Sequence, residues 1–195
     1  MFALSSVLVN SFAWKGAPAN SSIVASATLW IVIFFSSILV LTTSFAREVD
    51  RGTIDGLRSL PCPPYAILFG KILYGVAVLS IVVAVTSVSS VVFLGLQAET
   101  LPLMMLILAL GTLDLAMVGS MISALVMYSE GKTLLLSYLF FPVSVPILVP
   151  SSLATEKIIS GMGIVEVVAE LRLLLALLLA VTAGSIILFR NVFEE

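Results

Sequence analysis

Residues Leu101 to Met127 read LPLMMLILALGTLDLAMVGSMISALVM, an apolar run that one charged side chain, Asp114, interrupts. About 20 consecutive apolar residues in an α-helix cross the ~30 Å hydrocarbon layer of a bilayer. The run is therefore long enough to form a membrane-spanning helix. An ionisable group near the middle of such a helix is costly, by ~3 kcal/mol on insertion scales, so Asp114 is a candidate functional residue.

The whole chain has the composition of a multi-pass membrane protein. Its 195 residues are 61% hydrophobic and only 10% charged, and the mean hydropathy is +1.24. We predict an all-α polytopic fold in a single transmembrane domain that covers residues 1–195. The expected spans are 23–45, 67–96, 101–128, 133–152 and 171–190, preceded by a partial span over 1–14.

The first apolar segment, Met1 to Trp14, is shorter than a bilayer-spanning helix. The sequence Ala17-Pro18-Ala19 resembles the cleavage site of a secretory signal, but a signal begins with basic residues and none precedes this segment. We interpret the segment as a truncated first span, which gives six spans in the complete form. A signal peptide and a short interfacial segment are the alternatives.

The side-chain inventory disfavours an enzyme. The chain has no histidine and only one cysteine, Cys62, so the commonest general base and the commonest metal ligands are missing. It also has no G-x-x-x-x-G-K-[ST] motif, so any ATP hydrolysis must belong to a partner chain. We expect no catalytic residue, no metal site and no cofactor held by this chain itself.

The basic residues predict the orientation in the membrane, because Lys and Arg are enriched in cytoplasmic loops. Six of them lie on the side of segment 46–64 and of the C-terminus, and three lie on the other side. We therefore expect segment 46–64 and the C-terminus in the cytoplasm and segment 154–170 outside. The six are Arg47, Arg51, Arg58, Lys71, Lys132 and Arg190, and the three are Lys15, Lys157 and Arg172.

Residues 46 to 60 read AREVDRGTIDGLRSL and predict a short amphipathic helix. Val49, Thr53, Leu57 and Leu60 share one stripe at helical spacing, and charges of both signs flank it. The helix could be an interfacial connector or a docking helix for a soluble partner. We favour docking, because a lipid-facing connector would favour Lys and Arg over Asp and Glu. The candidate contact residues are Arg47, Glu48, Arg51, Asp55, Leu57 and Arg58.

Three prolines, Pro142, Pro146 and Pro150, stand at four-residue spacing in the expected span 133–152. Each removes a backbone donor and pushes against the preceding turn, so we predict a kinked or broken helix. A static kink and a hinge or gate are both open interpretations. The following segment, 154–170, can place its apolar residues on one side of a helix, and we expect it to lie in the external membrane surface.

Three roles are open for Asp114. It could be buried and bonded to a neighbouring helix, it could take part in a substrate path or a coupled movement, or it could face lipid. The same helix carries the small residues Gly111, Ala116, Gly119 and Ser120, which allow other helices to approach closely.

Two blocks of residues resemble the haem exporter protein B family, from Trp30 to Leu148. The first contains Leu29-Trp30, Ala46-Arg47-Glu48, Gly52-Thr53-Ile54-Asp55-Gly56-Leu57, Pro61 and Gly70-Lys71. The second contains Gly111-Thr112-Leu113, Gly119, Ser123-Ala124-Leu125, Gly131, Leu134-Leu135-Leu136, Pro142 and Pro146-Ile147-Leu148. The chain departs from the family pattern in its short first span and in Asp114, where a neutral residue is expected.

The resemblance implies a permease of the type-2 ABC exporter architecture in the inner membrane. It implies a subunit that serves haem export or delivery for cytochrome c-type biogenesis, with 46–60 as the coupling helix. The implied partners are a soluble ABC ATPase that uses ATP, a haem-handling membrane protein, a haem chaperone and a second copy of this chain. Haem is the ligand that the complex would transport or handle. The rival hypotheses are a similar permease that exports a lipid, peptide or drug, and a non-transporting assembly subunit.

Overall fold

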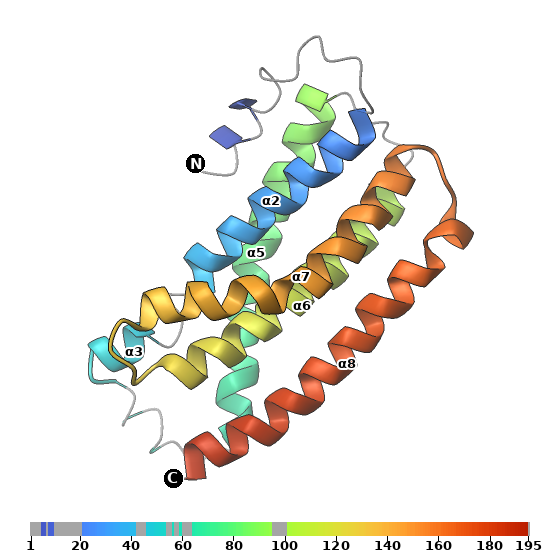
Figure 1. The fold of residues 1–195 in the computed structure, drawn as a ribbon. Helices are drawn as coiled ribbons and strands as arrows, with labels where there is room; N and C mark the ends of the chain where they lie inside the picture. The colour runs from blue at the N-terminus through green and yellow to red at the C-terminus, as the bar shows by residue number, and fades with distance from the viewer. Residues whose placement is uncertain are drawn as a thin grey trace.

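A computed structural model of the chain describes residues 5–6, 8–9, 21–41, 46–53, 56, 59, 64–94 and 101–194. Every regular element in these ranges is an α-helix, which confirms the predicted all-α class. The described helices include α2 Ser21–Leu41, α3 Ala46–Asp50, α5 Pro64–Leu94, α6 Leu101–Val126, α7 Lys132–Ile159 and α8 Ile164–Glu194 (Figure 1).

Four of these helices are long and apolar enough to cross a membrane. The candidate spans are Ser22–Leu41, Ala66–Ser89, Pro102–Val126 and Lys132–Ile159. Each of them overlaps one of the expected spans, and together they support a multi-pass membrane protein. The expected last span, 171–190, falls inside α8, which is not among the four, and most of the expected partial span 1–14 lies outside the described residues.

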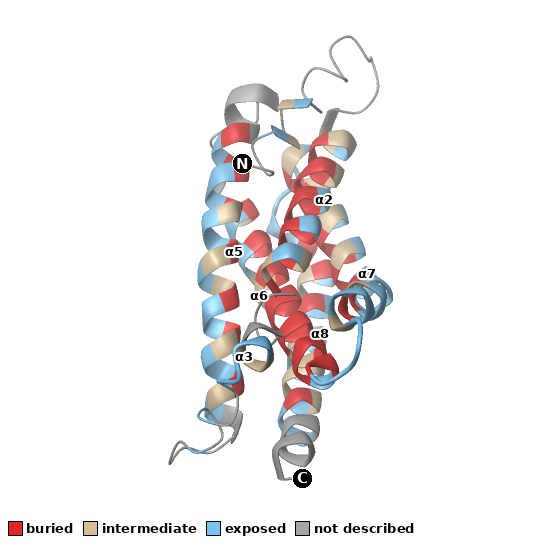
Figure 2. Cartoon of the chain, turned by 90° about the vertical axis from the view of Figure 1, so that its left-hand side faces the viewer, coloured by how far each residue is buried: buried red, intermediate tan, exposed pale blue. Residues whose placement is uncertain are grey.

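Helix α6 is the central helix of the bundle, because α2, α5, α7 and α8 all pack against it. Within the chain, 67% of its span is buried, against 28% for the spans of α5 and α7 (Figure 2). The close packing depends on glycine. A Cβ at Gly119 would lie 3.0 Å from Leu41 Cγ of α2, and one at Gly75 of α5 would lie 3.2 Å from Leu41 Cδ2. These contacts are those that small residues allow between membrane helices.

The segment 154–170 is not the separate surface helix that we predicted. Its first part completes α7, a turn follows, and its last part begins α8. The turn is a Schellman motif: Gly161 has φ 83°, its N–H donates to the carbonyl of Ile158, and the N–H of Met162 donates to the carbonyl of Lys157. Gly161 adopts this left-handed conformation without strain, so the chain reverses at that point.

The three prolines do not break α7, which runs unbroken from Lys132 to Ile159. Figure 1 shows the helix changing direction part-way along, so the predicted kink is present and the predicted break is not. Pro142 and Pro146 lie on the exposed surface of the bundle, whereas Pro150 is buried inside it. Whether the bend is a hinge or gate stays a prediction.

Candidate functional site

The short helix α3 is fixed to the end of the bundle where α6 ends and α7 begins (Figure 1). Glu48 Oε1 accepts a hydrogen bond from Lys71 Nζ of α5 at 2.7 Å. The Thr53 hydroxyl donates to the other carboxylate oxygen of Glu48. These two bonds hold the pKa of Glu48 below its ordinary value, and the bond from Lys71 has the larger effect. The carboxylate therefore stays ionised in a half-buried position.

Two further contacts complete the attachment of α3. Asp50 accepts a hydrogen bond of 2.5 Å from Nζ of Lys132, the first residue of α7. Val49 packs against an apolar cluster that α5 and α6 contribute. Together with the Glu48–Lys71 pair, these contacts attach α3 to three neighbouring helices. The buried members of that cluster are Leu68, Ile72, Met117, Ala124 and Met127.

The predicted continuous helix over 46–60 is wrong, because α3 ends at Asp50. Gly52 has φ 66° and donates its N–H to the carbonyl of Val49 at 3.1 Å, and the N–H of Thr53 donates to the carbonyl of Glu48 at 2.9 Å. This is the same Schellman cap as at the end of α7. The helical periodicity of the sequence continues past Gly52, whereas the helical backbone of α3 ends before it.

The structure places only some of the predicted contact residues. Asp55, Leu57, Arg58 and the side chain of Arg47 lie outside the described residues. Arg51 is exposed, whereas the Glu48 carboxylate accepts hydrogen bonds from Lys71 and Thr53. The geometry therefore gives Glu48 an anchoring contact inside the chain, which sequence reasoning missed.

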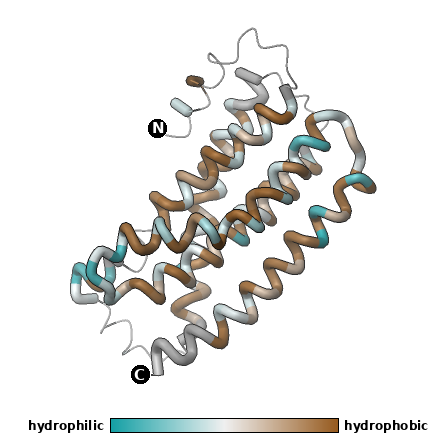
Figure 3. The backbone as a smooth tube through the Cα atoms, in the orientation of Figure 1, coloured by the Kyte–Doolittle hydropathy of each residue, from teal (hydrophilic) through white to brown (hydrophobic). Residues whose placement is uncertain are grey.

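Charged groups also join α7 to α8 at the opposite end of the bundle. Lys157 Nζ donates to Glu170 Oε1 at 2.6 Å and to the carbonyl of Glu166 at 3.0 Å. Burial opposes ionisation of Glu170, but the hydrogen bonds to its carboxylate and the charge of Lys157 outweigh burial and lower its pKa. Figure 3 shows hydrophilic residues gathered at these two ends, with hydrophobic helix surface between them.

Asp114 lies between these ends, in the interior of the bundle. Its exposed fraction is 0%, which rules out the lipid-facing interpretation. Neither carboxylate oxygen has a hydrogen-bond partner among the described residues. One turn earlier, Gly111 leaves room for the Trp30 ring of α2, whose Nε1 donates to Thr155 Oγ1 of α7 at 3.0 Å.

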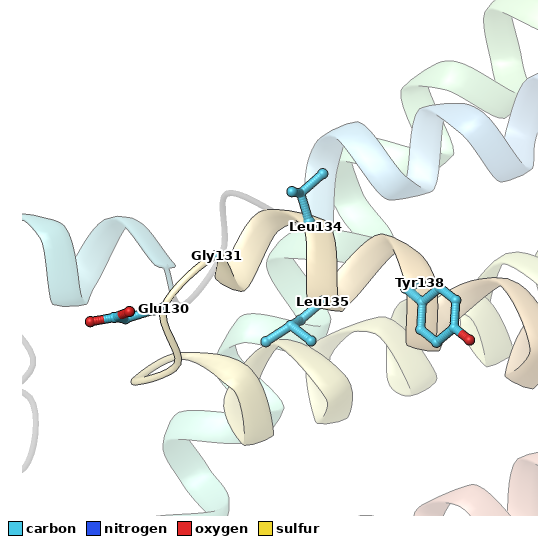
Figure 4. Close-up of a pocket in the computed structure, with 5 residues that line it drawn as sticks. All are labelled: Glu130, Gly131, Leu134, Leu135 and Tyr138. Carbon is cyan, nitrogen blue, oxygen red and sulfur yellow. The ribbon is translucent and has the colours of Figure 1, made fainter.

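A shallow hollow lies beside the attachment of α3, at the start of α7. Its lining is mainly apolar and includes Leu134, Leu135 and Tyr138, with Glu130 and Gly131 of the preceding turn (Figure 4). Glu130 points away from the apolar side chains in that view. The hollow is open, and we assign no ligand to it.

Apolar helices of spanning length around a buried central helix define a multi-pass α-helical membrane protein, and α3 gives it a polar, well-anchored element at one end. The family model "CcmB protein" matches residues 1–189, so the chain belongs to the CcmB family. The resemblance to haem exporter protein B is thereby confirmed.

Two curated relatives are both named "Heme exporter protein B". The one from Pseudomonas aeruginosa is 26% identical over 134 residues, which cover 69% of this chain and 60% of the relative. The one from Paracoccus denitrificans is 28% identical over 138 residues, which cover 71% of this chain and 63% of the relative. The matched region thus spans about three fifths of the length of each relative.

Proposed function

We propose that this chain is the membrane permease subunit of an ABC transporter complex of type-2 exporter architecture. The complex serves haem export or delivery for cytochrome c-type biogenesis, and this subunit converts the action of a partner ATPase into movement in the membrane. Membership of the CcmB family and the names of the two relatives support the haem assignment. Because the chain carries no P-loop motif, a separate soluble ATPase supplies ATP hydrolysis.

The attachment of α3 is the observation that carries the mechanical part of this proposal. A partner that pushes on α3 acts at once on α5, through Lys71, and on α7, through Lys132. A short helix attached to the bundle only through its two connecting loops would move by itself and would not transmit the force. The two ion pairs and the Val49 contact therefore suit α3 to transmit force into the bundle.

The partner test is purification of the tagged chain from native membranes, with identification of the subunits that accompany it. We expect a soluble ABC ATPase, a haem-handling membrane protein and a second copy of this chain. Arg51→Glu reverses an exposed charge on this surface and should weaken ATPase recovery several-fold. Arg172→Glu is the matched control, because Arg172 is also exposed but lies near the other end of the bundle. Full recovery of the ATPase with Arg51→Glu would exclude this surface as the contact.

Orientation in the inner membrane has its own test, because Cys62 is the only cysteine in the chain. We expect segment 46–64 in the cytoplasm, on the basis of the six-to-three distribution of basic residues. A membrane-impermeant thiol reagent should label Cys62 in inverted vesicles and leave it unlabelled in intact cells with a permeabilised outer membrane. Cys62→Ser is the control for background labelling. Labelling of intact cells would reverse the proposed orientation.

A further inference from the structure

Asp114 poses a chemical problem that the proposed function does not explain. The residue is fully buried in α6, and neither of its carboxylate oxygens has a partner among the described residues. An ionised carboxylate buried without a countercharge is very costly, so in this arrangement the side chain is the neutral carboxylic acid. Such a group can give up its proton only when water reaches it.

The contacts of its neighbours place Asp114 between α7 and α8. Gly111, three residues earlier, faces α7, because a Cβ there would lie 2.8 Å from Ser151 Oγ. Met117, three residues later, faces α8, because the Thr182 hydroxyl donates to its sulfur at 3.6 Å. Residues three apart share one side of a helix. Asp114 therefore lies on the side of α6 that α7 and α8 cover together.

Among the described residues, no titratable group of a neighbouring helix is placed to pair with Asp114. Helix α2 carries none. The nearest on α5 are Lys71, which is already in an ion pair, and Tyr74, which is exposed. The nearest on α7 and α8 are Glu156 and Arg172, and both lie about two turns further toward the end where α7 meets α8.

The part of α8 that covers Asp114 is loosely packed. Short turns join α6 to α7 and α7 to α8, so α6 and α8 run in the same direction, and Thr182 lies level with Met117 (Figure 1). No residue of α8 from 175 to 184 is buried. Segments with few buried contacts are the cheapest parts of a protein to displace. Displacement of this part of α8 would uncover Asp114.

Two buried hydroxyls continue from Asp114 toward the end of the bundle that carries α3. Ser120 follows Met117 by three residues and Ser185 follows Thr182 by three, so both lie at the same level of the contact between α6 and α8. Both are buried, and neither hydroxyl has a partner among the described residues. Water that enters between α6 and α8 from that end would find hydrogen-bonding groups on its way.

We propose that Asp114 is a proton-binding site that opens to water between α6 and α8. With α8 in place, the carboxyl keeps its proton. When α8 moves away from α6, water passes Ser120 and Ser185 and reaches the carboxyl. The O–H bond of Asp114 then breaks, water accepts the proton, and a hydrated carboxylate is left. Separation of α8 thus releases one proton and closure takes one up, so rising pH favours the open bundle. This role does not depend on what the complex transports.

Infrared spectroscopy of the full chain in lipid nanodiscs tests whether Asp114 holds a proton. At neutral pH the spectrum should contain the C=O band of a carboxylic acid, and Asp114→Asn should remove it. Glu170→Gln is the matched control, because it removes another buried carboxyl and should leave the band unchanged. Absence of the band from the unaltered chain would overturn the proposal.

Transfer to heavy water tests the route, because the band shifts once water exchanges the proton for deuterium. In a Cys62→Ser chain, a cleavable bifunctional thiol reagent can join Met117→Cys to Thr182→Cys and so tie α8 to α6. The shift should be several-fold slower with the link than after its cleavage, and high pH should weaken the band only in the unlinked chain. Gly75→Cys with Ala116→Cys is the control. Their Cβ atoms would lie 3.7 Å apart, so a disulfide there ties α5 to α6 and should leave the exchange unchanged.

A second pair of variants tests the route without any link. Ser185→Val removes a hydroxyl from the contact between α6 and α8, so it should slow the exchange several-fold. Ser87→Val is its control, because it removes a buried, unpartnered hydroxyl from α5 and should have no effect on the exchange. Equal rates in these two variants would overturn the route, as would a band that shifts equally fast with α8 tied or free, or that does not shift at all.

Discussion

Replacing Gly111 by alanine should destabilise the bundle by about 1–3 kcal/mol, the usual cost of forcing an extra carbon into a well-packed interior. The new Cβ would collide with one atom of the Trp30 ring, and it would lie 2.8 Å from a second ring atom and 2.8 Å from Ser151 Oγ. Trp30 is 2% exposed, and its Nε1 is bonded to Thr155, so the ring cannot move aside freely. Thermal unfolding in detergent measures the loss.

The matched control is Gly184→Ala in α8, where a Cβ would meet nothing within 4 Å. That change should be neutral or slightly stabilising, because alanine favours helix over glycine. Trp30→Phe removes the outer ring atoms that collide, so Gly111→Ala should cost less in that background. If the chain tolerates Gly111→Ala as well as Gly184→Ala, then the Trp30 ring of α2 is not held in place against α6 and α7.

Reversing the charge of Glu48 should release α3 from α5 and abolish coupling to the partner ATPase. Glu48→Lys places two ammonium groups where a 2.7 Å ion pair now stands, so the pair becomes repulsive. The chain should still insert, because the substituted residue, Glu48, lies outside the candidate spans. ATPase activity of the reconstituted complex should lose its dependence on this subunit.

The double exchange Glu48→Lys with Lys71→Glu is the decisive control, because it restores an ion pair with the charges reversed. Substantial recovery of coupling is expected for the double variant and none for either single variant. Single variants that couple normally would show that the pair does not transmit force. Because the folded pKa of Glu48 is lowered, its stabilising contribution is present at neutral pH and is lost as the pH falls through that lowered pKa.

The family resemblance and the helical class could be predicted from local sequence. Runs such as Leu101–Met127 fix a spanning helix, because a bilayer leaves the backbone no other way to satisfy its polar groups. The candidate site could be predicted only in part. The sequence identified the polar segment after Phe45 and the isolated Asp114, but it assigned Glu48 to a partner surface.

What the sequence by itself determined is the set of apolar helices, the proline bend in α7 and the family. Each of these depends on residues within a few turns of one another. The tertiary structure alone decided that Glu48 meets Lys71, 23 positions away, and that Trp30 reaches Thr155, 125 positions away. It also decided that the helices end at Asp50 and Ile159, where Gly52 and Gly161 adopt left-handed φ angles. Periodicity reports one face of one helix, whereas these contacts depend on how several helices pack, which no local pattern specifies.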